Sequence, residues 1–233
     1  ICDKSLRLAG QTILFAYTAK DVQAIRLNEQ VINQVKLAMK GYLAHLTRRQ
    51  LSKRQAILVQ YLDRCMSDLE RIGDHVEALC DTSLRRRKSL AGLVDRLSFS
   101  IFFQLYDSLL HLFKLLIQSF DPGGDHPADI ADQILLARDD YVQASSITRN
   151  HFNEQVTRRA MTAVAGIFYG EYLAGLDRIV RHIRNIALAE KQPQFWIKRS
   201  KLGKHVDLAP EPEHPPLVDP RDFLPRLQPD APP

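Results

Sequence analysis

The stretch Leu69–His75, which reads LERIGDH, decides the fold because a closely similar stretch follows later in the chain. It returns as Leu176–His182, which reads LDRIVRH, at a constant shift of 107 positions that carries Leu69 onto Leu176. A repeat at this distance indicates two copies of one supersecondary unit. The two copies can therefore be compared position by position.

Apolar residues recur at helical spacing along most of the chain, and Gly is sparse, as is Pro before residue 200. Ser52 and Gln55 form a capping-box pattern that predicts the start of a helix. Strand alternation and hairpin signals are missing. We therefore expect an all-α fold of two tandem three-helix bundles, with helices over 3–19, 20–47, from 52 onward, 90–119, 127–149 and 153–191.

Two of these helices carry a heptad seam, in which apolar residues alternate steps of three and four. In the third helix the seam is Leu58, Leu62, Cys65, Leu69, Ile72, Val76 and Leu79. In the sixth helix it is Tyr169, Tyr172, Leu176, Ile179, Ile183 and Ile186. Both helices are expected to pack against neighbours along these residues.

The expected organisation is a first repeat over 1–88, a second repeat over 89–192 and a tail over 193–233. Nine of the twelve prolines lie in 206–233, so the tail is expected to be extended. Because the chain opens with Ile rather than Met, it is expected to be cut from a longer protein.

Composition narrows the classes of function. The formal charge of +5 is too small to indicate a nucleic-acid partner by itself. Three cysteines without paired spacing favour a reducing compartment. No apolar run of about 20 residues is apparent, so no membrane span is expected within this chain.

The third helix carries an acidic stripe on the side away from its seam, formed by Asp63, Glu70, Asp74, Glu77 and Asp81. Glu70 and Asp74 are one turn apart, so both carboxylates can approach one cation. Oxygen ligands suit Mg, Ca, Mn or Fe, and His75 nearby extends the choice toward Fe or Zn. The alternative is an ordinary surface whose acids pair with Arg64, Arg71 or bases of adjacent helices.

Residues 68–75 closely resemble the signature of PhoU-domain proteins. Lys20-Asp21, Leu51-Ser52 and the tandem architecture match as well, so the resemblance covers about residues 5–190. It implies two similar three-helix bundles that act in the control of phosphate uptake. It also implies iron or zinc bound on the bundle surface through an acidic-x-x-x-Asp motif in each repeat.

Carried onto this sequence, the motif assigns Glu70 and Asp74 as metal ligands in the first repeat and Asp177 in the second. Arg181 stands where the second repeat should have its other carboxylate. A guanidinium group within a turn of a cation is electrostatically unfavourable. A cluster in the second repeat is therefore doubtful, and any iron or zinc is expected in the first.

The same substitution concentrates cationic donors in the second repeat, at Arg178, Arg181, His182 and Arg184. Such a patch is suited to phosphate or to an acidic surface. The alternative is that these side chains pair with Asp177 or with Asp139 and Asp140 on the fifth helix.

The resemblance favours a cytoplasmic regulatory domain of a membrane protein related to Na⁺/phosphate cotransporters, at the cytoplasmic side of the cell membrane. The expected partners are the transport domain of the same polypeptide, a second copy of the chain, and anionic lipid at residues 85–88 (RRRK). One alternative is a stand-alone cytoplasmic regulator of a phosphate ABC transporter and its sensor kinase. A carboxylate-metal enzyme is a further alternative, disfavoured because no catalytic motif appears.

Overall fold

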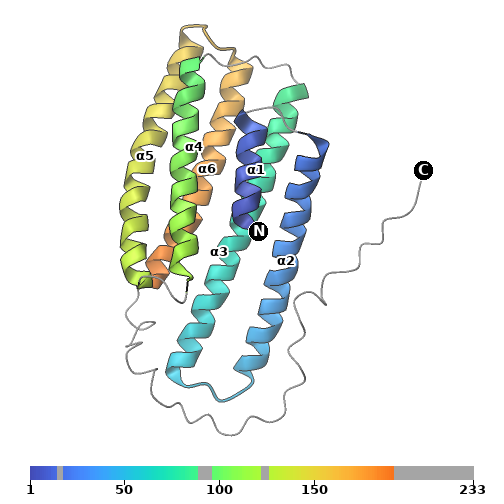
Figure 1. The fold of residues 1–233 in the computed structure, drawn as a ribbon, viewed down its shortest axis with the longest axis vertical. Helices are drawn as coiled ribbons and strands as arrows, with labels where there is room; N and C mark the ends of the chain where they lie inside the picture. Colours follow the sequence, from blue (N-terminus) through green and yellow to red (C-terminus); the bar gives the residue numbers. More distant parts are fainter. Residues whose placement is uncertain (15–17, 89–95, 122–125, 192–233) are drawn as a thin grey trace, which may run out of the picture. The chain divides into compact units, whose positions relative to one another are not determined.

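The computed structural model describes residues 1–14, 18–88, 96–121 and 126–191. The predicted tail over 193–233 lies outside these residues. All the regular structure described is helical, which confirms the all-α prediction. The six helices are α1 (Cys2–Leu14), α2 (Ala19–Thr47), α3 (Lys53–Lys88), α4 (Arg96–Ser119), α5 (Pro127–Thr157) and α6 (Ala163–Glu190) (Figure 1).

Two helix starts follow from local capping chemistry. The hydroxyl of Thr18 accepts from the backbone N–H of Asp21, and the Asp21 carboxylate accepts from the backbone N–H of Thr18. Ser52 and Gln55 form the same reciprocal arrangement ahead of α3, as predicted. The predicted helix over 3–19 was wrong at its end, because α1 stops at Leu14 and Thr18 caps the next helix.

The boundary between the last two helices also differs from the prediction. We expected one helix to end near residue 149, but α5 continues to Thr157. The reason is tertiary packing: Phe152 is 3% exposed, and its ring stacks on Tyr169 of α6 with 4.4 Å between centroids. The turn that follows contains Arg159 at φ 58°, a left-handed conformation rare outside glycine.

Helices α3 and α6 form the centre of the helical part. Helix α3 contacts α1, α2 and α6, and α6 contacts α3, α4 and α5 (Figure 1). The six helices belong to one compact unit, and buried side chains of both repeats belong to one hydrophobic core. The predicted division at residue 88 lies next to residues outside the described ranges and stays a prediction.

The predicted seams lie largely where expected. All six seam residues of α6 are buried, as are Cys65, Ile72, Val76 and Leu79 of α3. The prediction was wrong at Leu58, which is 48% exposed. Helix α1 has 13 residues whereas α4 has 24, so α1 covers only part of the α2–α3 pair (Figure 1).

Helix α4 requires a correction to the expectation about membrane spans. Among the described residues, Leu97–Ser119 is long and apolar enough to cross a membrane by length and composition. The same test is passed by core helices of water-soluble proteins, and α4 buries Phe102, Leu105, Leu109 and Leu112 in the shared core. We therefore interpret α4 as a core helix.

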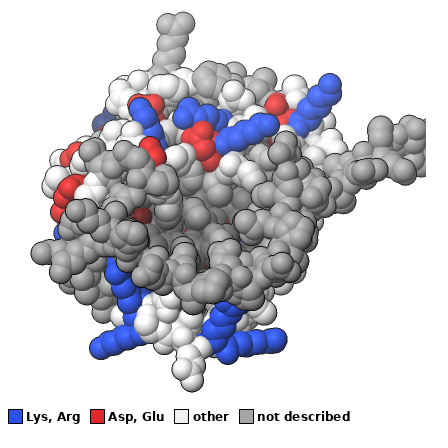
Figure 2. Space-filling view, turned by 60° about the horizontal axis from the view of Figure 1, so that its bottom comes forward, with Lys and Arg blue, Asp and Glu red and all other residues white. Residues whose placement is uncertain are grey.

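Charge is unevenly distributed over the face drawn in Figure 2. Acidic and basic side chains lie close together at its upper edge, whereas the charged side chains visible at its lower edge are basic. Ion pairs form between helices elsewhere in the described part, as between Arg26 of α2 and Asp81 of α3 at 3.0 Å.

Candidate functional site

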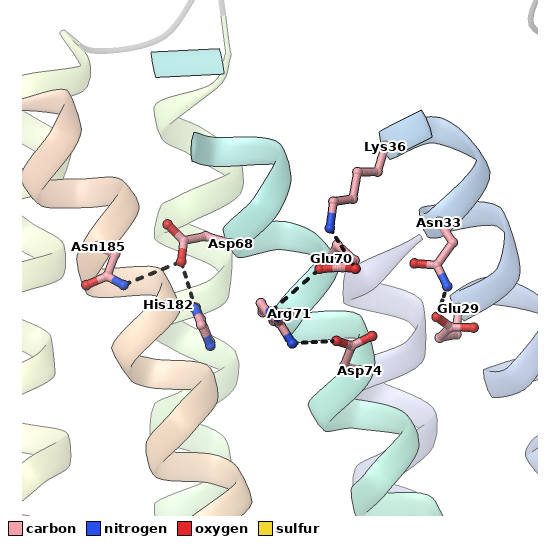
Figure 3. A network of polar contacts seen from close by, with 9 residues as sticks. All are labelled: Glu29, Asn33, Lys36, Asp68, Glu70, Arg71, Asp74, His182 and Asn185. Carbon is pink, nitrogen blue, oxygen red and sulfur yellow. Dashed lines mark hydrogen bonds and ion pairs between the residues drawn. The ribbon is translucent and has the colours of Figure 1, made fainter. Parts of the chain in front are cut away.

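In the first repeat, both predicted metal ligands already have cationic neighbours. The Lys36 ammonium of α2 lies 2.7 Å from Glu70 Oε1, and Arg71 lies 3.9 Å from Glu70 Oε2 (Figure 3). Arg71 also lies 3.6 Å from the Asp74 carboxylate. Burial, and next the Glu70 charge, raise the pKa of Asp74 above its ordinary value. Only 16% of the Glu70 side chain is exposed, because α2 covers it.

One observation fits a cation at this position. The Oε2 atom of Glu70 is buried and accepts no hydrogen bond, so it retains an unused lone pair. Against this, no three His, Cys, Asp or Glu side chains of the described part come close enough to hold a metal ion. Two carboxylates next to Lys36 and Arg71 are an incomplete ligand set. Iron or zinc at Glu70 and Asp74 therefore stays a prediction.

In the second repeat, Asp177 is held by donors from α5. Its Oδ1 accepts from Tyr141 at 3.1 Å and Ser145 at 2.9 Å, and its Oδ2 accepts from Arg149 at 2.7 Å. Burial is the main cause that raises the pKa of the Tyr141 hydroxyl, and the Asp177 charge adds to it. The hydroxyl therefore remains a donor. Three donors leave Asp177 little capacity to bind a metal as well.

The four residues of the predicted anion patch separate in the structure. Arg181 and Arg184 line a groove between α5 and α6. His182 points instead toward α3, where its Nδ1 lies 2.7 Å from Asp68 Oδ1, and Asn185 donates to the same oxygen (Figure 3). Arg178 is exposed and does not line the groove.

The groove contains residues that the sequence reasoning missed. Helix α5 contributes Arg138, Ser145, Ser146 and Arg149 to its lining, next to Arg181 and Arg184 of α6. Residues 138, 142, 145 and 149 follow steps of four, three and four, so they share one face of α5. The sequence shows this spacing, but no pattern within α5 itself indicates that this face packs against α6.

The contact between α3 and α6 brings the histidines of the two repeats together. The rings of His75 and His182 lie 5.4 Å apart between centroids. Burial first, then the charges of His182, Arg178, Arg71 and Arg181, lower the pKa of His75 to about 4. His75 is therefore neutral near pH 7 and is not poised to bind an anion.

A buried carboxyl also joins the two repeats. Glu190 is fully buried, and its Oε1 accepts from Tyr61 of α3 at 3.2 Å and from Ser119 of α4 at 2.8 Å. Burial raises the pKa of Glu190, and the two hydrogen bonds partly offset that effect. This residue was not among those singled out from the sequence.

The basic run at residues 85–88 is partly engaged within the bundle. Arg85 lies 2.7 Å from Glu171 Oε2, and Arg86 donates to the backbone oxygen of Ile13 at 2.9 Å. The Arg86 guanidinium also lies over the ring of Tyr172, 5.5 Å from its centroid. These contacts use two of the charges expected to meet lipid, so lipid contact stays a prediction.

Comparison with known proteins identifies the architecture. PhoU from Pseudomonas aeruginosa superposes with a TM-score of 0.72 at 17% identity, over 81% of this chain and 88% of that one. The phosphate transport system regulatory protein PhoU from Streptococcus pneumoniae gives 0.66 at 20% identity, over 88% and 91%. The chain has the PhoU fold. No protein-family model and no curated protein sequence matches it.

The PhoU fold gives the two carboxylate positions a common frame. Glu70 on α3 and Asp177 on α6 occupy equivalent positions of the two repeats. Each forms an ion pair with a basic side chain of the preceding helix in its own repeat, Lys36 of α2 and Arg149 of α5. The two repeats differ one turn later, at Asp74 and Arg181. At such identities the likeness concerns the fold alone.

Proposed function

We propose that this chain is a non-catalytic regulatory domain that controls phosphate transport from the cytoplasmic side of the cell membrane. The observation that carries this proposal is the PhoU fold, which extends over most of both compared chains. One of those proteins is a regulator of a phosphate transport system. A regulator acts by binding two states of a transporter unequally and so shifting their populations.

The finer proposal is that the domain belongs to a membrane protein related to Na⁺/phosphate cotransporters and contacts its transport part. In the second repeat, Arg181 stands where the acidic-x-x-x-Asp motif has its second carboxylate. This departure from the motif supports the transporter-linked domain over a stand-alone regulator. The stand-alone regulator remains the alternative. A homodimer and lipid contact at residues 85–88 remain predictions.

The carboxylates of this chain favour a regulatory role over an enzymatic one. Di-iron carboxylate enzymes project Glu and His into the bundle core from several helices. Here Ile72, Val76 and Ile179 occupy the core at the α3–α6 contact, and they are apolar. Glu70 and Asp177 are already ion-paired with Lys36 and Arg149 and point away from that core.

A deletion experiment tests the regulatory role. In cells that make the protein, we expect in-frame deletion of residues 1–190 to abolish the decline of phosphate uptake at high external phosphate. Uptake of radiolabelled phosphate is measured at low and high external phosphate, together with the amount of transport protein in the membrane. Unchanged uptake at both concentrations, with an unchanged amount of transporter, would contradict the proposal.

Fractionation of the same cells separates the two forms of the proposal. An antibody raised against this chain should detect a band much larger than 26.6 kDa in the membrane fraction. A band near 26.6 kDa in the water-soluble fraction would instead favour the stand-alone regulator.

A further inference from the structure

The groove between α5 and α6 is a concentrated site of positive charge. It has a volume of about 460 Å³, within the range of small-molecule sites. Four arginines line it, Arg138 and Arg149 from α5 and Arg181 and Arg184 from α6. Asp177 is the single acidic side chain of the lining.

The existing ion pairs leave part of this charge uncompensated. Arg149 lies 2.7 Å from Asp177, and Arg138 lies 2.8 Å from its sequence neighbour Asp139. Arg181 and Arg184 form no ion pair within the described ranges. Two guanidinium groups one turn apart on a helix repel each other unless an anion lies between them.

The groove also supplies hydroxyl groups next to its arginines. Ser145 is buried and donates to Asp177 at 2.9 Å, so it helps to fix the only carboxylate of the lining. Ser146 lies beside it in the lining. Planar guanidinium groups bind phosphate oxygens in pairs, and the Ser146 hydroxyl can add a single hydrogen bond, whereas that of Ser145 is already donated to Asp177. This donor set is suited to an oxyanion and unsuited to a cation.

We infer that the groove binds a phosphate group, carried by inorganic phosphate or by a phosphorylated small molecule, with Arg181 and Arg184 as its main ligands. The site occupies the place where the repeat comparison would have put a second metal. It differs from the patch expected from sequence, because Arg178 and His182 lie outside it while Arg138 and Arg149 of α5 belong to it. The inference does not depend on the proposed function.

Isothermal titration of the purified 233-residue chain at constant ionic strength tests the site. The probes are inorganic phosphate, pyrophosphate and adenosine monophosphate, with sulfate as a charge control. We expect saturable binding of one phosphate probe per chain. Arg181→Ala and Arg184→Ala should each weaken it at least tenfold. Tightest binding of inorganic phosphate indicates the free ion, whereas preference for pyrophosphate or the nucleotide indicates a phosphorylated molecule.

Two further variants make the test specific. Arg178→Ala removes an exposed arginine of the same helix that does not line the groove. The affinity of this variant for the phosphate probe should therefore stay within twofold of the parent. Asp177→Asn removes the competing carboxylate and releases Arg149, so it should tighten binding severalfold, whereas a metal site would be lost. Circular dichroism establishes that each variant is folded.

The inference is overturned if none of the three phosphate probes binds saturably, or if sulfate binds as tightly as the best of them. It is also overturned if Arg178→Ala weakens binding as much as Arg181→Ala, because the charge would then act diffusely.

Discussion

At the scale of single residues, equivalent positions in the two repeats have acquired different partners. Glu70 is paired with Lys36, whereas Asp177 is held by Tyr141, Ser145 and Arg149. The 107-residue shift carries Lys36 onto Gln143, which has no charge to offer. Each carboxylate is therefore neutralised from a different position of the preceding helix, and the environments cannot be transferred between repeats.

His75 provides a prediction about pH. Its pKa is about 4 in the folded chain against an ordinary value of 6.5. As pH falls from 6.5 toward 4, the unfolded chain therefore takes up a proton that the folded chain does not, and stability falls. We expect His75→Gln to lose less stability than the parent between pH 7 and 4.5, by about 1–2 kcal/mol after allowance for solvent screening.

Urea unfolding at a series of pH values measures this difference. His75→Gln also removes ring packing against His182, which lowers stability at every pH. The test therefore compares how steeply the free energy of unfolding changes with pH in the variant and in the parent. His45→Gln is the matched control, because it removes an exposed histidine of α2. Parallel curves for His75→Gln and the parent would refute the assignment.

At the scale of elements, the approach of α6 to α3 depends on a glycine. A Cβ atom built on Gly175 would lie 2.7 Å from Leu79 Cδ2 and 3.2 Å from Leu79 Cγ. Leu79 is 2% exposed, so it cannot turn aside without displacing other core side chains. Gly170, on the same helix, has no atom within 4 Å of such a Cβ.

These two glycines make a matched pair. Gly175→Ala should lower the free energy of unfolding by about 1–2 kcal/mol, because overpacking outweighs the gain in helix propensity. Gly170→Ala should raise it by up to about 1 kcal/mol, since only propensity changes. Chemical denaturation of both variants measures the difference. Equal effects would show that α3 and α6 do not approach closely at Gly175.

Sequence reasoning succeeded where the determining interactions are local. The capping box of Ser52 and Gln55 and the seam of α6 depend on residues within a few turns of one another, and the structure confirms them. The end of α5 and the composition of the groove depend on Phe152 and Arg149 meeting α6, which no local pattern encodes. The fold was therefore largely predictable, whereas the partners of the site residues were not.

At the scale of the whole molecule, the two repeats share one interior. The buried faces of α3 and α6 cover each other, with Ile72 and Val76 on one side and Leu176 and Ile179 on the other. Arg86 at the end of α3 adds polar contacts to Ile13 of its own repeat and Tyr169 of the other. Separation of the repeats would expose this apolar surface to water.

Fragments 1–88 and 89–192 test how far the repeats depend on each other. We expect each fragment alone to show helical circular dichroism without a cooperative thermal transition, because its largest apolar face is uncovered. An equimolar mixture should recover a cooperative transition. If each fragment alone unfolds cooperatively, the repeats are independent domains.

The groove between α5 and α6 lies beside the contact between the two repeats, which would couple the two. Arg181 and Arg184 face α5, while the adjacent residues His182 and Ile183 face α3 and the core. A short segment of helix moves as a rigid body. A ligand that drew these arginines toward α5 would therefore also shift the side chains of α6 that pack against α3. Ligand binding in the groove would then be coupled to the packing of the second repeat against the first, because both involve the same segment of α6.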